Sequence, residues 1–197
     1  MTPDAFAAKR YLIVPGFLEP GLTTYLWQYL RMKAVYGLIA RHDRSVPGAI
    51  SRYGDEAFEA LLETVRPRVE ALTGLGLHPA FSYVRVYRRG DLLKRHRDRR
   101  ACEITVSINL GQIPDAPWPL HIQGETGDAD AAVLMPGDGL IYRGIEMFHW
   151  RDSYEGEQCG QVFLHYVDRA GPHAKRKYDG RERLMMPRDA GGETHIA

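Results

Sequence analysis

The sequence has few cysteines, almost no excess of charge and no long hydrophobic run. Its 197 residues include two cysteines, Cys102 and Cys159, which are too few for a disulfide framework and predict reduced thiols. The formal net charge is +1, so the composition indicates no nucleic-acid partner and no acidic membrane surface. No window holds the roughly 18 apolar residues of a membrane span, and the first residues do not resemble a signal peptide. These absences predict a cytoplasmic protein.

The apolar residues that are present change their spacing along the chain. With 44% hydrophobic and 26% charged residues, a chain of this length fits a single globular domain. Apolar residues at helical spacing predict helices at 22–30 and 58–65, and Pro67 is expected to break or kink the second. Residues 42–53 are rich in Gly, Pro, Ser and charge, which predicts a loop in the position of a lid.

From Phe81 onward the apolar residues alternate with a period of two, as in β-strands. Residues 102–110 alternate between an apolar face that begins with Cys102, expected in the core, and a polar face that includes Thr105 and Ser107. Many short strands after two helices indicate a β-sandwich or barrel. The polar tail from Gly171 is expected to wrap the surface or to be partly disordered. The other strands are expected at 11–14, 81–87, 120–123, 132–135, 140–142, 148–151 and 161–167.

The strongest chemical signal is His96-Arg97-Asp98, followed about fifty residues later by His149 in a strand-like run. Residues i and i+2 of an extended segment point the same way, so His96 and Asp98 can bind one metal. His149 can supply a third ligand from a neighbouring strand. Two histidines and a carboxylate on one face of an octahedron leave three open positions, which suits non-haem Fe(II). The alternative is a charged surface loop and a hydrogen-bonded core histidine, but the joint pattern favours a metal site.

Four segments together resemble the prolyl-hydroxylase-like branch of the Fe(II)/2-oxoglutarate-dependent oxygenases. They are YRRGDLLKRHRD, CEITVSINL, PGDGLIYRGIEMFHWRD and QVFLHYVD. The resemblance covers roughly residues 11–168. It implies a mainly β fold with flanking helices and a double-stranded β-helix (jelly-roll) core. In this interpretation residues 1–197 are a single domain, with a helical support layer at about 20–76, the core at about 77–170 and a polar tail.

The resemblance also implies a chemistry and the residues that carry it. Fe(II) would be held by His96, Asp98 and His149, and Tyr87 would help to bind 2-oxoglutarate. The reaction would consume O₂, hydroxylate an unactivated C–H bond of a small-molecule, amino-acid or peptide substrate, and release succinate and CO₂. The polar face of 102–110 can be a solvated sheet face or a pocket wall. Because it directly follows the metal motif, a pocket is favoured for Thr105 and Ser107.

One departure from the family pattern concerns the cation that binds the distal carboxylate of 2-oxoglutarate. The family usually has Arg or Lys roughly ten residues after the second histidine, where this chain reads Glu-Gln-Cys-Gly-Gln at 157–161. A dicarboxylate in a dry pocket still needs a charged, preferably bidentate partner. Arg151 is the preferred candidate and Arg85 the second, although a rim ion pair of Arg151 with Asp152 or Glu155 is nearly as well supported. Other cations that could serve are Arg143 and Lys94.

Several functions therefore stay open. The preferred one is the oxygenase acting on a small molecule; a wide groove beside His96 would instead favour a peptide or protein substrate. A cupin-like metal-binding or sensing module without turnover would be favoured if no cation reached the co-substrate position. A zinc hydrolase is less favoured, because no adjacent general base of the His-Glu-x-x-His kind is present. The basic run 94–100 is interrupted by the metal motif and fits a solvated rim better than a nucleic-acid site. The oligomeric state is left open.

Overall fold

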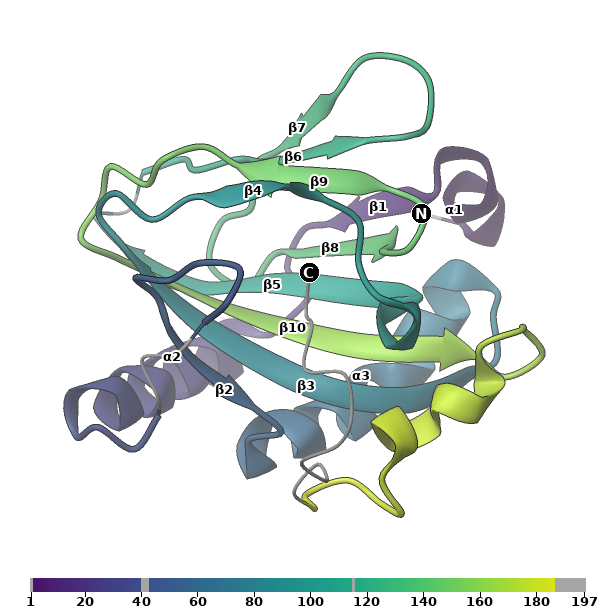
Figure 1. Ribbon diagram of the computed structural model, residues 1–197, viewed down its shortest axis with the longest axis horizontal. Coiled ribbons are helices and arrows are strands. Elements are labelled where there is room, and N and C mark those ends of the chain that lie inside the picture. Colours follow the sequence, from purple (N-terminus) through teal and green to yellow (C-terminus); the bar gives the residue numbers. More distant parts are fainter. Residues whose placement is uncertain (1, 40–42, 115, 187–197) are drawn as a thin grey trace.

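A computed structural model describes residues 2–39, 43–114 and 116–186. In these ranges two antiparallel sheets lie face to face, with the smaller sheet above the larger one in Figure 1. This mainly β arrangement with flanking helices confirms the predicted jelly-roll fold class. The larger sheet has the order β1 (Tyr11–Val14), β8 (Gly139–Arg143), β5 (Ile104–Ile113), β10 (Gln158–Asp168), β3 (Leu77–Arg88), β2 (Ile50–Tyr53), and the smaller has the order β4 (Leu93–His96), β9 (Phe148–Arg151), β6 (Leu120–Gln123), β7 (Asp130–Ala132).

Two helices, α2 (Pro20–Val35) and α3 (Glu56–Thr73), cover the outer face of the larger sheet (Figure 1). Helix α3 begins after Asp55, whose side chain caps the first turn, and ends at Gly74 in a left-handed conformation with φ +72°. None of the helices in the described ranges is long and apolar enough to cross a bilayer. The α3 side chains buried against the sheet repeat at helical spacing: Phe58, Leu61, Leu62, Val65 and Val69.

The structure corrects several of the expected elements. Pro67 lies inside α3, so the expected break there is wrong; burial of Val65 and Val69 on either side offsets the roughly 3 kcal/mol that an internal proline costs. Residues 50–53 of the expected loop form β2, while His42 lies outside the described residues. The strand expected at 132–135 is found at 130–132. Elements that were not expected are α1 (Pro3–Lys9), β4 and the turns of η2 (Ala174–Gly180).

The first part of the C-terminal tail packs against the sheets. The 3₁₀ turns of η2 contact β3 and β10, and Asp179 within them is buried. The two oxygens of this carboxylate each lie 2.7 Å from a guanidinium nitrogen of Arg99, and one of them accepts a hydrogen bond from the Tyr53 hydroxyl. The tail therefore wraps the surface as far as η2. Residues 187–197 lie outside the described ranges.

Helix α2 is packed closely on the sheet through Trp27, whose ring lies over Gly111 of β5 and Gly160 of β10. The two glycines are directly opposite each other in the β5–β10 ladder. A Cβ atom at Gly160 would lie 2.3 Å from the Trp27 ring, and one at Gly111 would lie 2.7 Å from it. The missing side chains thus create the space in which the indole packs.

Gly160→Ala is expected to lower the free energy of unfolding by about 1–3 kcal/mol, the usual cost of inserting a methyl group into a packed core. Gly21→Ala, in α2, is the matched control, because a Cβ there meets nothing within 4 Å. The control is expected to stay within about 0.5 kcal/mol of the wild type. Urea denaturation of the two variants measures the difference, and equal stabilities would mean that Trp27 moves aside without cost.

Candidate metal centre and the adjoining pocket

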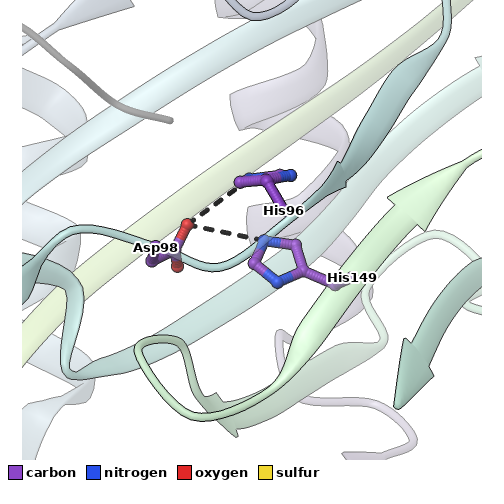
Figure 2. A group of neighbouring side chains, drawn as sticks. All are labelled: His96, Asp98 and His149. Atoms are coloured by element: carbon purple, nitrogen blue, oxygen red, sulfur yellow. Dashed lines mark ion pairs between the residues drawn. The ribbon is translucent and has the colours of Figure 1, made fainter.

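The three predicted metal ligands converge where β4 and β9 run side by side (Figure 2). His96 of β4 is directly opposite His149 of β9, and Asp98 follows β4 by two residues. One carboxylate oxygen of Asp98 (Oδ1) lies 3.6 Å from Nε2 of His96 and 3.4 Å from Nε2 of His149. Their side chains are largely buried, with exposed fractions of 15% for His96, 5% for Asp98 and 3% for His149.

Hydrogen bonds to the backbone fix the tautomers of both histidines. Nδ1 of His96 lies 2.8 Å from the carbonyl oxygen of Lys94, and Nδ1 of His149 lies 3.1 Å from that of Met147. A carbonyl oxygen only accepts, so each Nδ1 carries the proton and each Nε2 directs its lone pair towards the cluster. Burial raises the pKa of Asp98, but in the metal-free protein the neighbouring imidazoles of His149 and His96, when they are protonated, lower this pKa well below its usual range.

This donor set fits an octahedral divalent metal. Two neutral imidazole nitrogens and one ionised carboxylate are the ligands of the facial triad. Neighbouring ligands at about 2.1 Å from an octahedral ion lie about 3 Å apart. The separations of 3.4 and 3.6 Å around Asp98 need only a small contraction to reach that geometry.

A pocket extends from the triad into the space between the sheets and contains two buried guanidinium groups, those of Arg85 and Arg151. Its remaining lining is mostly apolar or aromatic: Tyr83, Leu93, Leu120, Tyr142, Phe163 and His165. Among the described lining residues, Asp98 is the single carboxylate. The triad and two guanidinium groups thus border the same pocket.

Arg85 is already neutralised by a carboxylate of this chain. Its Nε and Nη2 lie 2.5 and 3.1 Å from the two oxygens of Asp43, and Nη1 donates to the Tyr87 hydroxyl at 2.8 Å. Asp43 belongs to the segment that was predicted as a lid, and Val46 and Ala49 of that segment pack into the same core cluster as Tyr87. Through Asp43 this segment thus contacts a residue of the pocket wall, and its role as a lid stays a prediction.

Arg151 is a buried cation with no ion pair among the described residues. Its Nη1 donates to the carbonyl oxygen of Trp118 at 2.5 Å, and its guanidinium lies 4.5 Å from the centre of the Trp118 ring. Its Nη2 is buried without a hydrogen-bond partner, and burial lowers the pKa of the group. The alternative of a rim ion pair is wrong, because Arg151 is 2% exposed and Asp152 lies 3.0 Å from His121 instead.

The position on β10 at which the resemblance led us to expect a cation holds a cysteine. Cys159, ten residues after His149, is buried, and burial raises the pKa of its thiol. The positive charge of the pocket is therefore supplied from β9. The two remaining cation candidates do not line the pocket: Arg143 pairs with Glu146 at 3.3 Å, and Lys94 is exposed.

The polar face of β5 is buried, so the alternative of a solvated sheet face is wrong. The Thr105 hydroxyl lies 3.0 Å from the second oxygen (Oδ2) of Asp98, which connects it to a predicted metal ligand. The Ser107 hydroxyl is buried without a hydrogen-bond partner in the described ranges. Neither residue lines the pocket. Thr105 is thus a supporting residue of the triad, and its expected contact with the co-substrate stays a prediction.

Cys102 does not lie on the apolar face to which the alternation assigned it. That face, beginning with Ile104, packs against the helices, whereas Cys102 lies in the 3₁₀ turn Arg100–Cys102 and packs near Phe81. The chain turns between residues 102 and 104, so strand alternation does not extend across it. Cys102 is buried, as expected, but close to Asp98 and His165.

His165 is a pocket residue that the sequence analysis did not single out. It lies on β10, its ring packs 4.3 Å from that of Phe81, and burial lowers its pKa to about 4, so the imidazole is neutral near pH 7. The signal was present in the expected strand 161–167, where alternation places Phe163 and His165 on one face and Val162 and Leu164 on the other. Asp43 had no such signal, because it lies in a segment without periodicity.

A groove of about 710 Å³ reaches Asp98 from the outside of the pocket. Arg99 in its wall pairs with Asp179, whereas Arg100 and Arg176 have no ion pair within the described ranges. The rest of the groove is formed by Ala101, Ile145 and His173. The metal site is thus approached from two sides, by the buried pocket and by an open, positively charged groove.

Comparison with known proteins supports the fold. No protein-family model matches the chain, and no curated protein sequence matches it. By structure, the chain has the fold of the prolyl hydroxylases and other iron- and 2-oxoglutarate-dependent oxygenases, which confirms the predicted resemblance at the level of the fold. A prolyl-4-hydroxylase from Pseudomonas putida superposes with a TM-score of 0.71 at 16% identity, covering 86% of this chain and 98% of its own.

Two further structures show the range of reactions within this fold. A prolyl hydroxylase from Trichoplax adhaerens, in complex with a hypoxia inducible factor peptide, has a TM-score of 0.70 at 17% identity and covers 90% of both chains. The epimerase SnoN from nogalamycin biosynthesis, in complex with Fe³⁺, alpha ketoglutarate and nogalamycin RO, has a TM-score of 0.67 at 15% identity, with 84% and 82% covered. Hydroxylases and an epimerase share the fold, so the reaction must be argued from the site.

Proposed function

We propose that this chain is a non-haem Fe(II)- and 2-oxoglutarate-dependent dioxygenase that hydroxylates an unactivated C–H bond and releases succinate and CO₂. One observation carries the proposal: the same pocket is lined by the His96/Asp98/His149 cluster and by Arg151, whose buried Nη2 has no hydrogen-bond partner among the described residues. The complex of SnoN with Fe³⁺ and alpha ketoglutarate supports the pairing of metal and co-substrate in this fold. A cytoplasmic location stays a prediction from the reduced cysteines.

Each end of the co-substrate has a matching set of side chains. His96, Asp98 and His149 would hold Fe(II), and Arg151 would bind the distal carboxylate of 2-oxoglutarate through Nη2. Because Arg85 is neutralised by Asp43, the remaining charges are those of the divalent metal, Arg151 and Asp98, whose net charge of about +2 a dianion balances. When bound, the iron supplies the activation of O₂ that couples decarboxylation of 2-oxoglutarate to oxidation of the substrate. The apolar walls at Leu93 and Leu120 exclude water from this space.

The groove beside Asp98 supports a substrate that extends beyond the pocket. Its size favours a peptide or a bulky small molecule over a single amino acid. Arg100 and Arg176 give its wall a positive charge that acidic groups on a substrate would complement. The Trichoplax adhaerens enzyme with its peptide shows that this fold accommodates an extended ligand.

The metal-binding module without turnover is the second candidate. The sequence favours this module only if no cation reaches the co-substrate position. Arg151 is a buried guanidinium without an ion pair among the described residues, which argues against this candidate. Burying an unpaired cation costs free energy, and a site that binds only a metal ion does not require such a cation.

Anaerobic titration of the protein with Fe(II) and 2-oxoglutarate tests the proposal. The expected result is the weak visible charge-transfer band of the iron chelate, saturating with 2-oxoglutarate. Glutarate is the matched control, because it has both carboxylates but lacks the 2-keto oxygen and should give no band. Iron binding without a band at any 2-oxoglutarate concentration would reject the dioxygenase and leave the metal-binding module.

A further inference from the structure

Three hydrogen-bonding groups in a row determine the tautomer of His165. Oδ2 of Asp98 lies 3.0 Å from the Thr105 hydroxyl, and the same hydroxyl lies 3.0 Å from Nδ1 of His165. The ionised carboxylate only accepts, so the single hydroxyl proton of Thr105 is donated to it. The backbone carbonyl of Cys102, 3.3 Å from the hydroxyl, is also an acceptor and draws the proton away from His165 as well.

The Thr105 oxygen must then accept a hydrogen bond from His165. Nδ1 of His165 therefore carries the proton of the neutral ring, and Nε2 has a free lone pair. Packing of the ring against Phe81 holds it in this orientation. If the ring had the opposite tautomer, Thr105 would have to donate to Nδ1 and its oxygen would face the Asp98 carboxylate at 3.0 Å with no proton between them.

Nε2 of His165 is buried and has no hydrogen-bond partner among the described residues. His165 lines the pocket together with His96, Asp98 and His149. A buried acceptor without a partner costs about 1–3 kcal/mol, which a ligand with a donor group can offset. A free acceptor on a residue that lines the pocket with the triad can distinguish ligands that present a donor from those that do not.

We propose that Nε2 of His165 accepts a hydrogen bond from the substrate, so that the site selects molecules with a hydroxyl or N–H group next to the reacting C–H bond. Thr105 is the positioning residue that sets this preference by holding the proton of His165 on Nδ1. The identification of the ligand as a substrate rests on the proposed function, whereas the tautomer and the acceptor do not.

Long-range ¹H–¹⁵N NMR of the ¹⁵N-labelled, metal-free protein tests the tautomer, with His165 assigned by the loss of its signals in His165→Gln. The expected pattern is a protonated, pyrrole-type Nδ1 and an unprotonated, pyridine-type Nε2. Thr105→Val is expected to shift the population towards the Nε2–H form, and Thr105→Ser to preserve the wild-type pattern. A wild-type ring protonated on Nε2 would overturn the proposal.

Acetamide and N,N-dimethylacetamide then probe the acceptor, since the two amides differ in whether they carry N–H groups. Acetamide is expected to move the Nε2 resonance upfield in a saturable way, and the dimethylated amide is expected to leave it in place. Equal responses to the two amides, or no response to acetamide, would refute the acceptor role. Because this experiment uses no iron and no 2-oxoglutarate, it can succeed even if the chelate titration fails, which would separate the two proposals.

Discussion

Arg151→Met is expected to weaken 2-oxoglutarate binding by at least about 100-fold while leaving the affinity for Fe(II) unchanged. Removal of a charged hydrogen-bond partner from a buried carboxylate costs about 3 kcal/mol or more, and each 1.4 kcal/mol is a factor of ten. Methionine retains much of the side-chain volume and lacks the charge. Titration of the charge-transfer band of the iron chelate under anaerobic conditions measures both affinities.

A second ligand shows which end of the co-substrate Arg151 binds. 2-Oxobutyrate has the same 2-keto acid head as 2-oxoglutarate but no distal carboxylate. The wild type is expected to bind 2-oxoglutarate at least about 100-fold more tightly than 2-oxobutyrate, and Arg151→Met is expected to lose this preference. Arg151→Lys should retain part of it, because lysine keeps the charge but not the planar fork.

The stability of the same variant separates a binding role from a structural one. In the metal-free protein Arg151 is a buried cation without a described ion pair, so Arg151→Met should leave the free energy of unfolding equal or higher. Loss of 2-oxoglutarate binding together with a clear loss of stability would identify Arg151 as structural. If Arg151→Met still preferred 2-oxoglutarate, Arg85 would be the residue that binds the distal carboxylate. In that case 2-oxoglutarate would have to displace Asp43 from Arg85.

The three residues of the proposed triad could be singled out in the sequence because part of their arrangement follows from local rules. His96 and Asp98 are two residues apart in an extended segment, and His149 lies in a strand whose partner is β4. Alternation with a period of two also allowed most strands to be predicted, because the side chains of a two-layer sandwich face either the interior or the outside. The pairing of β4 with β9 is a long-range contact that the sequence alone did not establish, whereas the spacing of His96 and Asp98 and the strand alternation are local.

The electrostatic partners could not be found in this way. Asp43 reaches Arg85 from an aperiodic segment, and Asp179 reaches Arg99 from the tail, so neither pair has a sequence period. The choice between Arg85 and Arg151 depended on the first of these pairs. Because Asp43 neutralises Arg85, Arg151 is the pocket guanidinium that has no ion pair among the described residues. The ion pairs of Arg85 and Arg99 therefore depend on contacts between distant parts of the chain, which a local sequence pattern does not reveal.

Local propensity misled where tertiary contacts opposed it. Pro67 predicts a break or a kink in the helix, yet α3 continues past it, with apolar residues on both sides of it buried against the sheet. Cys102 follows the alternation of β5 in sequence, yet the 3₁₀ turn places it on the side of Asp98. In both cases the local rule describes the isolated segment correctly, and the packing of that segment changes the outcome.

Asp98→Asn is expected to reduce the affinity for Fe(II) by at least about 100-fold, more than the 10- to 100-fold typical of losing an outer partner of a metal ligand. The amide has the shape of the carboxylate but supplies no negative charge, and two neutral imidazoles alone hold Fe(II) weakly. Tryptophan fluorescence or calorimetric titration with Fe(II) under anaerobic conditions measures the loss. Thr105→Val removes the neighbour of Asp98 but no ligand, and is expected to have the smaller effect.

Asp98→Ala separates the loss of the ligand from damage to its surroundings. The truncated side chain leaves a buried space beside His96 and His149, into which a formate ion can bring a carboxylate. Formate is expected to restore much of the Fe(II) affinity of this variant, and formamide, which has the same shape without the charge, is expected to restore none. Rescue by both would mean that the space needs filling rather than a ligand. If Asp98→Asn bound Fe(II) as tightly as the wild type, Asp98 would not be a metal ligand. The proposed iron-dependent oxygenase would then lose its main support.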